Sequence, residues 1–264
     1  MDRFRNLPEE VIFHILSFLT TKEAALTSVL SKRWRYLFAF VPNLHIDDSI
    51  FLNQEEQRDD VEDLFIEFVE RVLALQGNSP INKCSISCIC VGSVRVDAWI
   101  RNVLEPGVEE LGLLIVLDLQ TVGKKKGWSP TCFEGKKFVK LEISYALDID
   151  WFDGRIFLPM LRTLILKFVD LSIDKFGSLL HGFPALEELV MGHITWSSRD
   201  AAVSDASLKR LTITSNHIAY HYFYLGTFSV DTPSLVRFCY SDYDAIDYPV
   251  VKMKSLVRLG LAFW

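Results

Sequence analysis

The chain has 264 residues, half of them apolar, and a net charge of −6 at neutral pH, a composition that predicts a folded protein with a sizeable core and gives no basic surface for nucleic acid. No apolar run reaches the ~20 residues that cross a bilayer, and the N-terminus begins with charged residues instead of a secretory apolar stretch. The chain has five cysteines, an odd number, so we expect free thiols and a cytoplasmic or nuclear location. From the charge and the apolar runs we expect neither a membrane nor nucleic acid as a partner.

The N-terminal segment begins with a predicted helix. Pro8 suits the first turn, because its missing N–H would have no partner there. The carboxylates of Glu9 and Glu10 complement the positive end of the helix dipole. Apolar residues then recur at three- and four-residue steps and predict one broad apolar face on a helix that ends near residue 20.

Two further short helices are predicted before residue 40. Thr20 or Thr21 caps the second, over residues 22–30, and Ser31 caps the third, over residues 32–38. About 40 residues in three short helices bury too small a fraction of their surface to be stable alone. We therefore expect the surplus apolar surface of this segment to contact a partner.

A linker at residues 48–54 precedes an amphipathic helix over residues 55–76, which we expect to cap the repeats that follow. Its opposite face is acidic. Charge on the outer face of a helix is usually solvated, and we prefer that interpretation to a docking site for a basic partner. The predicted apolar face comprises Val61, Leu64, Phe65, Phe68, Val69 and Val72.

From residue 77 to the end, one spacing of apolar residues recurs eight times at intervals of about 21 to 30 residues, as leucine-rich repeats do. Its last two apolar residues point to the same side of an extended strand, into a core. The copies are Ile81-x-x-Cys84-x-Ile86, Val108-x-x-Leu111-x-Leu113, Phe138-x-x-Leu141-x-Ile143, Leu161-x-x-Leu164-x-Leu166, Leu186-x-x-Leu189-x-Met191, Leu208-x-x-Leu211-x-Ile213, Leu235-x-x-Phe238-x-Tyr240 and Leu256-x-x-Leu259-x-Leu261.

Stacking of these copies predicts the fold class. A single strand of this kind cannot bury its apolar side, whereas stacked copies form a parallel sheet on the concave side of a curved α/β solenoid. Pro159, Pro184 and Pro233 stand at equivalent places before three copies and predict an extended approach to the strand. The alternative, unrelated buried strands in an ordinary α/β domain, does not explain this repetition.

One cysteine pattern is compatible with metal binding but has a simpler interpretation. Cys84, Cys88 and Cys90 would share one side of a strand with Ile86, where small apolar thiols are commonly core residues, and no second cluster completes a zinc site. The sequence contains no nucleophile elbow and no phosphate-binding glycine loop. We predict no catalytic residue, no metal and no cofactor.

The N-terminal residues resemble the F-box of plant F-box/LRR-repeat proteins, in particular the FBD-associated group. Over residues 1–47, Leu7-Pro8, the helix with Ile15-Leu16-x-x-Leu19, and Ser31-Lys32-Arg33-Trp34 occur in the family's order. The body resembles the same family at residues 176–189, where a short helix, a glycine, a proline and Leu-Glu-Glu-Leu follow one another. Phe183 replaces the cysteine often found before that proline.

The resemblance implies three parts and a role. Residues 1–47 would be the F-box, residues 48–76 the linker and capping helix, and residues 77–264 the repeats. A member of this family docks through its F-box on the Skp adaptor of an SCF-type ubiquitin ligase, and through it on a cullin, while its repeats hold the protein to be ubiquitinated. The predicted adaptor-binding residues are Leu7, Pro8, Val11, Ile15, Leu16, Leu19, Val29, Leu30 and Trp34.

Trp34 is the foremost of these candidates, because an exposed tryptophan is a common interface anchor. Each adaptor-binding candidate could instead belong to the internal core. For the unknown target protein we expect the strand positions that alternate with the core leucines, whose mixed charges suit a protein partner. The predicted substrate-binding residues are Lys140, Glu142, Thr163, Lys167, Glu188, Arg210, Thr212 and Arg237.

Two features keep a second function open. The chain ends at Trp264 on the strand of the eighth repeat, without the FBD region that usually follows in this group. We expect the uncapped last repeat to expose apolar residues, which lowers solubility or invites a partner. A repeat scaffold that has kept F-box residues but no longer engages a ligase is therefore the alternative.

Overall fold

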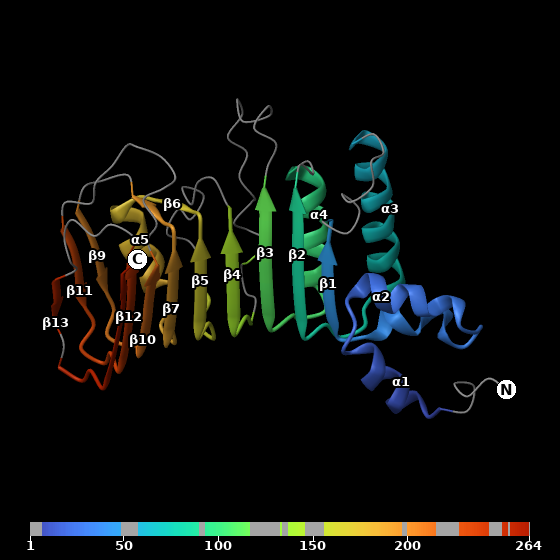
Figure 1. The fold of residues 1–264 in the computed structure, drawn as a ribbon, viewed down its shortest axis with the longest axis horizontal. Coiled ribbons are helices and arrows are strands. Elements are labelled where there is room, and N and C mark those ends of the chain that lie inside the picture. Colours follow the sequence, from blue (N-terminus) through green and yellow to red (C-terminus); the bar gives the residue numbers. More distant parts are fainter. Residues whose placement is uncertain are drawn as a thin grey trace. The chain divides into compact units, whose positions relative to one another are not determined.

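A computed structural model describes residues 7–48, 58–89, 93–116, 133, 137–145, 156–196, 200–214, 227–242, 250–252 and 254–263. The chain forms two compact units, Met1–Lys124 and Lys125–Trp264. The predicted fold class is confirmed, since N-terminal helices precede repeats whose strands form parallel sheets (Figure 1).

The N-terminal segment of the first unit is helical, but its first two helices are shorter than predicted. The elements are α1 (Glu9–Leu16), α2 (Thr21–Leu26) and the 3₁₀ segments η1 (Thr27–Val29) and η2 (Trp34–Phe40). The first helix ends at Leu16 because the backbone N–H groups of Phe18 and Leu19 donate to carbonyls three residues back, which tightens the last turn. The predicted third helix is a 3₁₀ helix rather than an α-helix.

Thr20, one of the two predicted caps, begins α2. Its hydroxyl accepts a hydrogen bond from the Glu23 backbone N–H at 3.3 Å, and the Glu23 carboxylate accepts one from the Thr20 backbone N–H at 2.9 Å. The bond from the Thr20 backbone lowers the pKa of Glu23, so this pairing weakens as the pH falls through that pKa. Thr21 is instead buried, and its hydroxyl accepts from the backbone N–H of His45 at 2.7 Å.

Three parallel strands form the sheet of the first unit. They are β1 (Asn43–Asp47), β2 (Lys83–Ile89) and β3 (Glu110–Val116), in that order. In-register pairing places Leu44 beside Cys84 and Ile46 beside Ile86, with all four side chains buried. The sequence prediction missed β1, whose spacing Val41-x-x-Leu44-x-Ile46 is one more copy of the repeat, inside the range interpreted as F-box.

Two helices accompany this sheet, α3 (Arg58–Gln76) and α4 (Ser93–Leu104) (Figure 1). The amphipathic helix predicted at residues 55–76 is α3, and Phe65, Val69 and Val72 are buried as expected. Leu64, which was predicted on the same face, is exposed instead. Phe65 meets Trp99 of α4 edge to face, with ring centroids 5.9 Å apart. The sequence prediction did not include α4.

Six parallel strands form the main sheet of the second unit. In order they are β4 (Lys140–Ser144), β5 (Thr163–Lys167), β7 (Glu188–Gly192), β10 (Arg210–Thr214), β12 (Arg237–Asp242) and β14 (Arg258–Phe263). They pair in register, so the core leucines of successive repeats stack on one side. The eight strands predicted from residue 77 onward are thus all present across the two units.

The segments between these strands carry the remaining elements. Helix α5 (Ile173–His181) separates β5 from β7, and two small sheets run through the connecting segments. One consists of β6 (Asp170–Leu171) and β8 (Thr195–Trp196), and the other of β9 (Asp200–Ser204), β11 (Thr227–Asp231) and β13 (Val250–Lys252). Val203 and Val230 of the second small sheet are buried, so these strands help to close the core.

The three repeated prolines form turns rather than the predicted extended approach. Pro159, Pro184 and Pro233 each occupy the second position of a turn closed by a backbone hydrogen bond, for example from Leu186 N–H to the Phe183 carbonyl at 3.0 Å. Proline favours this position because its fixed φ matches the turn. Each turn places the first apolar residue of its repeat in the core.

Gly182 is required by a close approach of two backbone segments. A Cβ at this position would overlap the backbone carbonyl oxygen of Ile156, which cannot move away freely because Leu158 N–H donates to the Gly182 carbonyl at 2.9 Å. We expect Gly182→Ala to lower the free energy of unfolding by about 1–3 kcal/mol or more, measured by urea denaturation.

Gly177→Ala is the matched control. Gly177 lies within α5, and nothing lies within 4 Å of an added Cβ there. Because alanine is the better helix former, this variant should leave stability unchanged or raise it by up to about 1 kcal/mol. Equal stability of the two variants would contradict the close approach at Gly182.

Candidate functional site

Large apolar side chains are exposed on the N-terminal helices of the first unit. Phe18 is 76% exposed, Leu26 61% and Val29 84%, fractions that folded monomers rarely show for several neighbouring apolar residues of one small segment. We refer to this group as the exposed head residues. They are Val11, Ile15, Phe18, Leu26, Val29, Leu30 and Phe40.

The geometry of α1 divides its apolar residues between two faces. Ile12 and Leu16, four residues apart, are fully buried, whereas Val11 and Ile15, also four apart, are exposed. Residues four apart lie above one another on a helix, so each pair forms its own stripe. The single apolar face predicted for this helix is therefore two stripes, of which one packs inside and the other remains accessible.

Arg33 fixes the start of α1. Its Nη1 donates to the backbone carbonyl of Leu7 at 2.6 Å, and its Nη2 lies 3.9 Å from Oε1 of Glu9. The Ser-Lys-Arg-Trp stretch thus holds the Leu-Pro stretch in place, although 26 residues separate Leu7 from Arg33 in the chain. Pro8 is exposed beside this contact.

Most of the predicted adaptor-binding residues are at least partly accessible. Pro8, Val11, Ile15, Val29 and Leu30 are exposed, and Leu7 and Leu19 are partly buried.

Leu16 and Trp34 are buried, which corrects their interpretation as accessible contact residues. Trp34 is only 2% exposed, and Phe38, one turn later, is buried as well. The reason is that η2 turns these two side chains inward, where it packs against both α1 and α2. In this chain Trp34 is a core residue of the helical segment.

Phe18, Leu26 and Phe40 were missed as candidate contact residues. The signal for Leu26 was present in the sequence, because it lies about 200° around α2 from Ala24, one of the two buried residues of that helix. Phe18 gave no such signal, because its exposure depends on the early end of α1. Its ring meets His14 edge to face, with centroids 4.9 Å apart.

All eight predicted substrate-binding residues lie on the solvent side of the main sheet of the second unit. Register pairing aligns the first positions of successive strands, as in Thr163 with Glu188 and Glu188 with Arg210. It aligns the third and fifth positions in the same way, so residues from different repeats meet. The aligned residues are Lys140, Glu142, Thr163, Lys167, Glu188, Arg210, Thr212 and Arg237.

Hydrogen bonds and ion pairs connect several of these residues across strands. Lys167 Nζ lies 2.8 Å from Glu142 Oε1, and Arg210 Nη2 lies 3.3 Å from Glu188 Oε2. Thr163 Oγ1 donates to the same Glu188 oxygen at 3.4 Å. These contacts leave a mixed, largely neutralised surface over β4 to β10, which suits recognition of a protein.

An aromatic column stands at the end of three of these strands. Tyr145 and Phe168 stack with centroids 4.4 Å apart, and Phe168 and His193 stack at 4.6 Å. All three residues have a positive φ, between 52° and 63°, a backbone conformation that residues other than glycine rarely adopt. Spacing alone did not indicate this column, because its residues lie one position beyond each strand.

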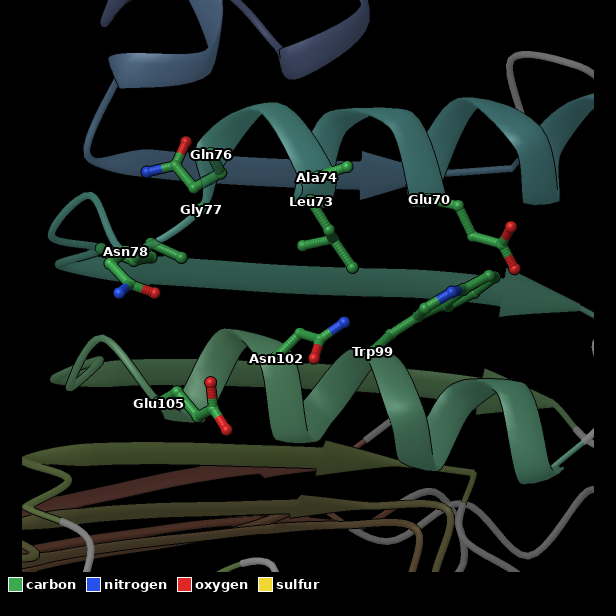
Figure 2. Close-up of a pocket in the computed structure, with 10 residues that line it drawn as sticks. Glu70, Leu73, Ala74, Gln76, Gly77, Asn78, Trp99, Asn102 and Glu105 are labelled. Carbon is green, nitrogen blue, oxygen red and sulfur yellow. The ribbon is translucent and has the colours of Figure 1, made fainter.

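A cavity of about 290 Å³ lies in the first unit between α3 and α4 (Figure 2). Leu73 and Trp99 give it an apolar wall, and Glu70, Asn102 and Glu105 give it polar groups (Figure 2). Its volume is at the lower limit for small-molecule sites, and Glu70 is already paired with Arg95 at 3.1 Å. The cavity brings together no nucleophile and base among its lining residues.

Metal binding finds no support in the part of the chain that the structure describes, where no three His, Cys, Asp or Glu residues cluster. Cys84 and Cys88 are buried on one side of β2 with Ile86, as predicted, and Cys90 lies outside the described residues. No helix among the described residues is long and apolar enough to span a bilayer.

Burial raises the pKa of the Cys84 thiol to about 12. At pH 8 only about one such thiol in ten thousand is ionised, so we expect iodoacetamide to label Cys84 at least about a hundredfold more slowly than the half-buried Cys239. Mass spectrometry of the labelled peptides measures both rates, and denaturant should make them equal. Equal rates in the folded protein would show that Cys84 is accessible.

Comparison with known proteins matches both parts of the chain. The F-box domain family matches residues 4–45. The family described as FBD-associated F-box protein At5g56370, LRR repeats, matches residues 96–262, more than half of the chain. The chain belongs to this F-box/LRR-repeat family.

Three relatives of this F-box/LRR-repeat chain come from Arabidopsis thaliana. It is 58% identical over 260 residues to F-box protein At3g59000 and 48% identical over 273 residues to F-box/LRR-repeat protein At5g38396, covering 97% and 98% of this chain. It is 47% identical over 263 residues to F-box/LRR-repeat protein At3g58900, covering 98%. The chain spans about half the length of the first two relatives, 52% and 56%, and 78% of the third.

Proposed function

We propose that this F-box/LRR-repeat chain is the substrate-recognition subunit of an SCF-type ubiquitin ligase. Its F-box would dock on a Skp-type adaptor, and through it on a cullin, while the solvent side of the repeat sheet would bind a target protein. This role belongs to the cytoplasm or nucleus, where the free thiols of Cys84, Cys88 and Cys239 remain reduced.

The exposed head residues support this proposal best. Several large apolar side chains remain accessible in the segment that matches the F-box family, although the same segment buries Ile12, Leu16 and Trp34 in its own core. The accessible side chains are therefore in excess of what folding of the segment requires. Apolar residues of this kind form the centre of protein interfaces.

The proposed mechanism is proximity rather than chemistry. A subunit that holds a target lysine near a ubiquitin-charged enzyme converts a bimolecular encounter into a nearly intramolecular one, with an effective concentration of the order of millimolar or above. The surfaces assigned to this task are separate in the chain, the exposed head residues in the first unit and the aligned strand positions in the second. Neither requires a catalytic residue.

A three-component pull-down tests the proposal. The chain is immobilised and mixed with a purified Skp-type adaptor and a cullin, together and separately. We expect the adaptor to bind directly and the cullin to be retained only when the adaptor is present. If the folded chain, checked by circular dichroism, retains neither protein, it is a repeat scaffold that does not engage a ligase.

A further inference from the structure

Three arginines stand side by side on the solvent side of the main sheet of the second unit. Arg210 begins β10, Arg237 begins β12 and Arg258 begins β14. The strand register pairs Arg210 with Arg237 and Arg237 with Arg258. We call these three residues the arginine row. The sequence prediction included the first two as separate candidates and missed Arg258.

Carboxylates pair with two basic side chains on this side of the sheet. Lys167 is paired with Glu142, and Arg210 with Glu188. Arg237 and Arg258, by contrast, form no ion pair with any residue that the structure describes. Among the described residues, cross-strand pairing with carboxylates thus reaches Arg210, and the exposed guanidinium groups of Arg237 and Arg258 have no carboxylate partner there.

Like charges at paired strand positions destabilise a sheet, and adjacent strands are only about 4.8 Å apart. The arginine row places three positive charges at this spacing, and among the described residues only Arg210 of the row is ion-paired, with Glu188. The net charge of these four residues is +3 − 1 = +2. An acidic ligand with two carboxylates would neutralise this remaining charge. The planar guanidinium group of arginine can pair with a carboxylate through two parallel hydrogen bonds.

The sheet beside the row is lined by small side chains. Two positions after the arginines, Thr212, Cys239 and Gly260 are paired in register, and a Cβ on Gly260 would lie 3.2 Å from the Cys239 sulfur. Small residues at these positions allow a bound backbone to approach the sheet closely. The arginine row is thus an accessible group of positive charges beside a part of the sheet that carries only small side chains.

We infer that the arginine row binds an acidic segment of the target protein, one that presents two neighbouring Asp or Glu side chains. This inference deepens the proposed function and rests on it, because it names the chemistry of the target that the repeats would hold. Nucleic acid fits less well, because the chain has a net charge of −6 and Glu142 and Glu188 lie on the same side of the sheet.

The test is fluorescence anisotropy of a labelled twelve-residue peptide that contains a Glu-Asp-Glu-Asp core, titrated with the full chain. A peptide with Gln and Asn in the core is the neutral control. We expect the acidic peptide to bind and the neutral one not to bind. Arg237→Gln/Arg258→Gln should weaken binding by about tenfold or more, as expected for the loss of two exposed charge pairs.

Lys252→Gln/Lys254→Gln is the matched variant. It removes the same total charge from the same unit, but Lys252 lies on β13, in the other sheet, where it pairs with Asp231 at 3.1 Å. We expect it to bind the acidic peptide within about twofold of the unmodified chain, since surface charges away from the site contribute little. Equal loss in both double variants would overturn the inference, because it would indicate general attraction alone.

Charge reversal guards against misfolding of the first variant. Arg237→Glu/Arg258→Glu should lose the acidic peptide and gain a peptide with a Lys-Arg-Lys-Arg core. Three further outcomes would overturn the inference: no binding of the acidic peptide, binding only after phosphoserine replaces its acidic residues, or tighter binding of single-stranded RNA of the same length. The pull-down with the adaptor tests the exposed head residues of the first unit, whereas the peptide titration tests the arginine row of the second. Failure of the proposed function and failure of this inference are therefore distinguishable.

Discussion

Replacing Leu26 and Val29 together by aspartate is expected to weaken binding of a Skp-type adaptor by at least about a hundredfold, because central apolar contacts of an interface contribute about 2 kcal/mol or more each. Both side chains are mainly exposed in the chain itself, so the fold should tolerate the change. A pull-down with purified adaptor, together with a circular dichroism melt, measures both effects.

Val250→Asp/Val257→Asp is the matched control. These two valines are 61% and 75% exposed and thus similar in accessibility, but they belong to the second unit. We expect this variant to bind the adaptor like the unmodified chain. Loss of binding in the control, or full binding by Leu26→Asp/Val29→Asp, would show that the exposed head residues do not form the adaptor surface.

Trp34→Ala is expected to lower the free energy of unfolding by about 3–5 kcal/mol, the usual cost of removing a large buried aromatic side chain. Trp34 is one of the largest fully buried side chains of the protein, and η2, which carries it, packs against α1 and α2. Urea denaturation followed by far-ultraviolet circular dichroism measures the loss. Adaptor binding should fall only as the folded fraction falls.

Phe40→Ala provides the comparison within the same 3₁₀ helix. Phe40 is about half exposed, and its replacement should change stability by about 0.5 kcal/mol, the range typical of surface positions. A Trp34→Ala variant that is as stable as the unmodified chain yet fails to bind the adaptor would restore the interpretation of Trp34 as an interface anchor.

The repeats could be predicted because their signal is strong and repeated. Leu164, Leu189 and Leu211 follow the same spacing in successive copies, and all three are buried in paired strands. Each copy supports the assignment of the others, which a single strand cannot do. The same periodicity placed Glu188 and Arg210 on the solvent side, where they lie next to each other.

Features that depend on packing between elements could not be predicted in this way. The apolar residues of α1 occur at one helical spacing, but only the position of the neighbouring helices decides that Ile12 is buried and Val11 exposed. Trp34 shows the same limitation, because a tryptophan after a short helix suits a core and an interface equally well. Strand β1 was missed because its repeat spacing follows directly on the helical segment.

The arginine row illustrates a further limit. The sequence separates Arg237 from Arg258 by 21 residues, and neither is remarkable alone. Their adjacency follows from the register of β12 and β14, and neither forms an ion pair with a residue that the structure describes. Both facts require the structure, although the recurrence of charged residues at the first strand position was already visible.

Titration calorimetry of the full chain with a purified Skp-type adaptor, at several temperatures, tests the central claim most directly. We predict a one-to-one complex with a negative heat capacity change of binding, because the exposed head residues would be removed from water. Absence of binding by a chain whose folding is verified in the same sample would contradict the ligase-subunit function.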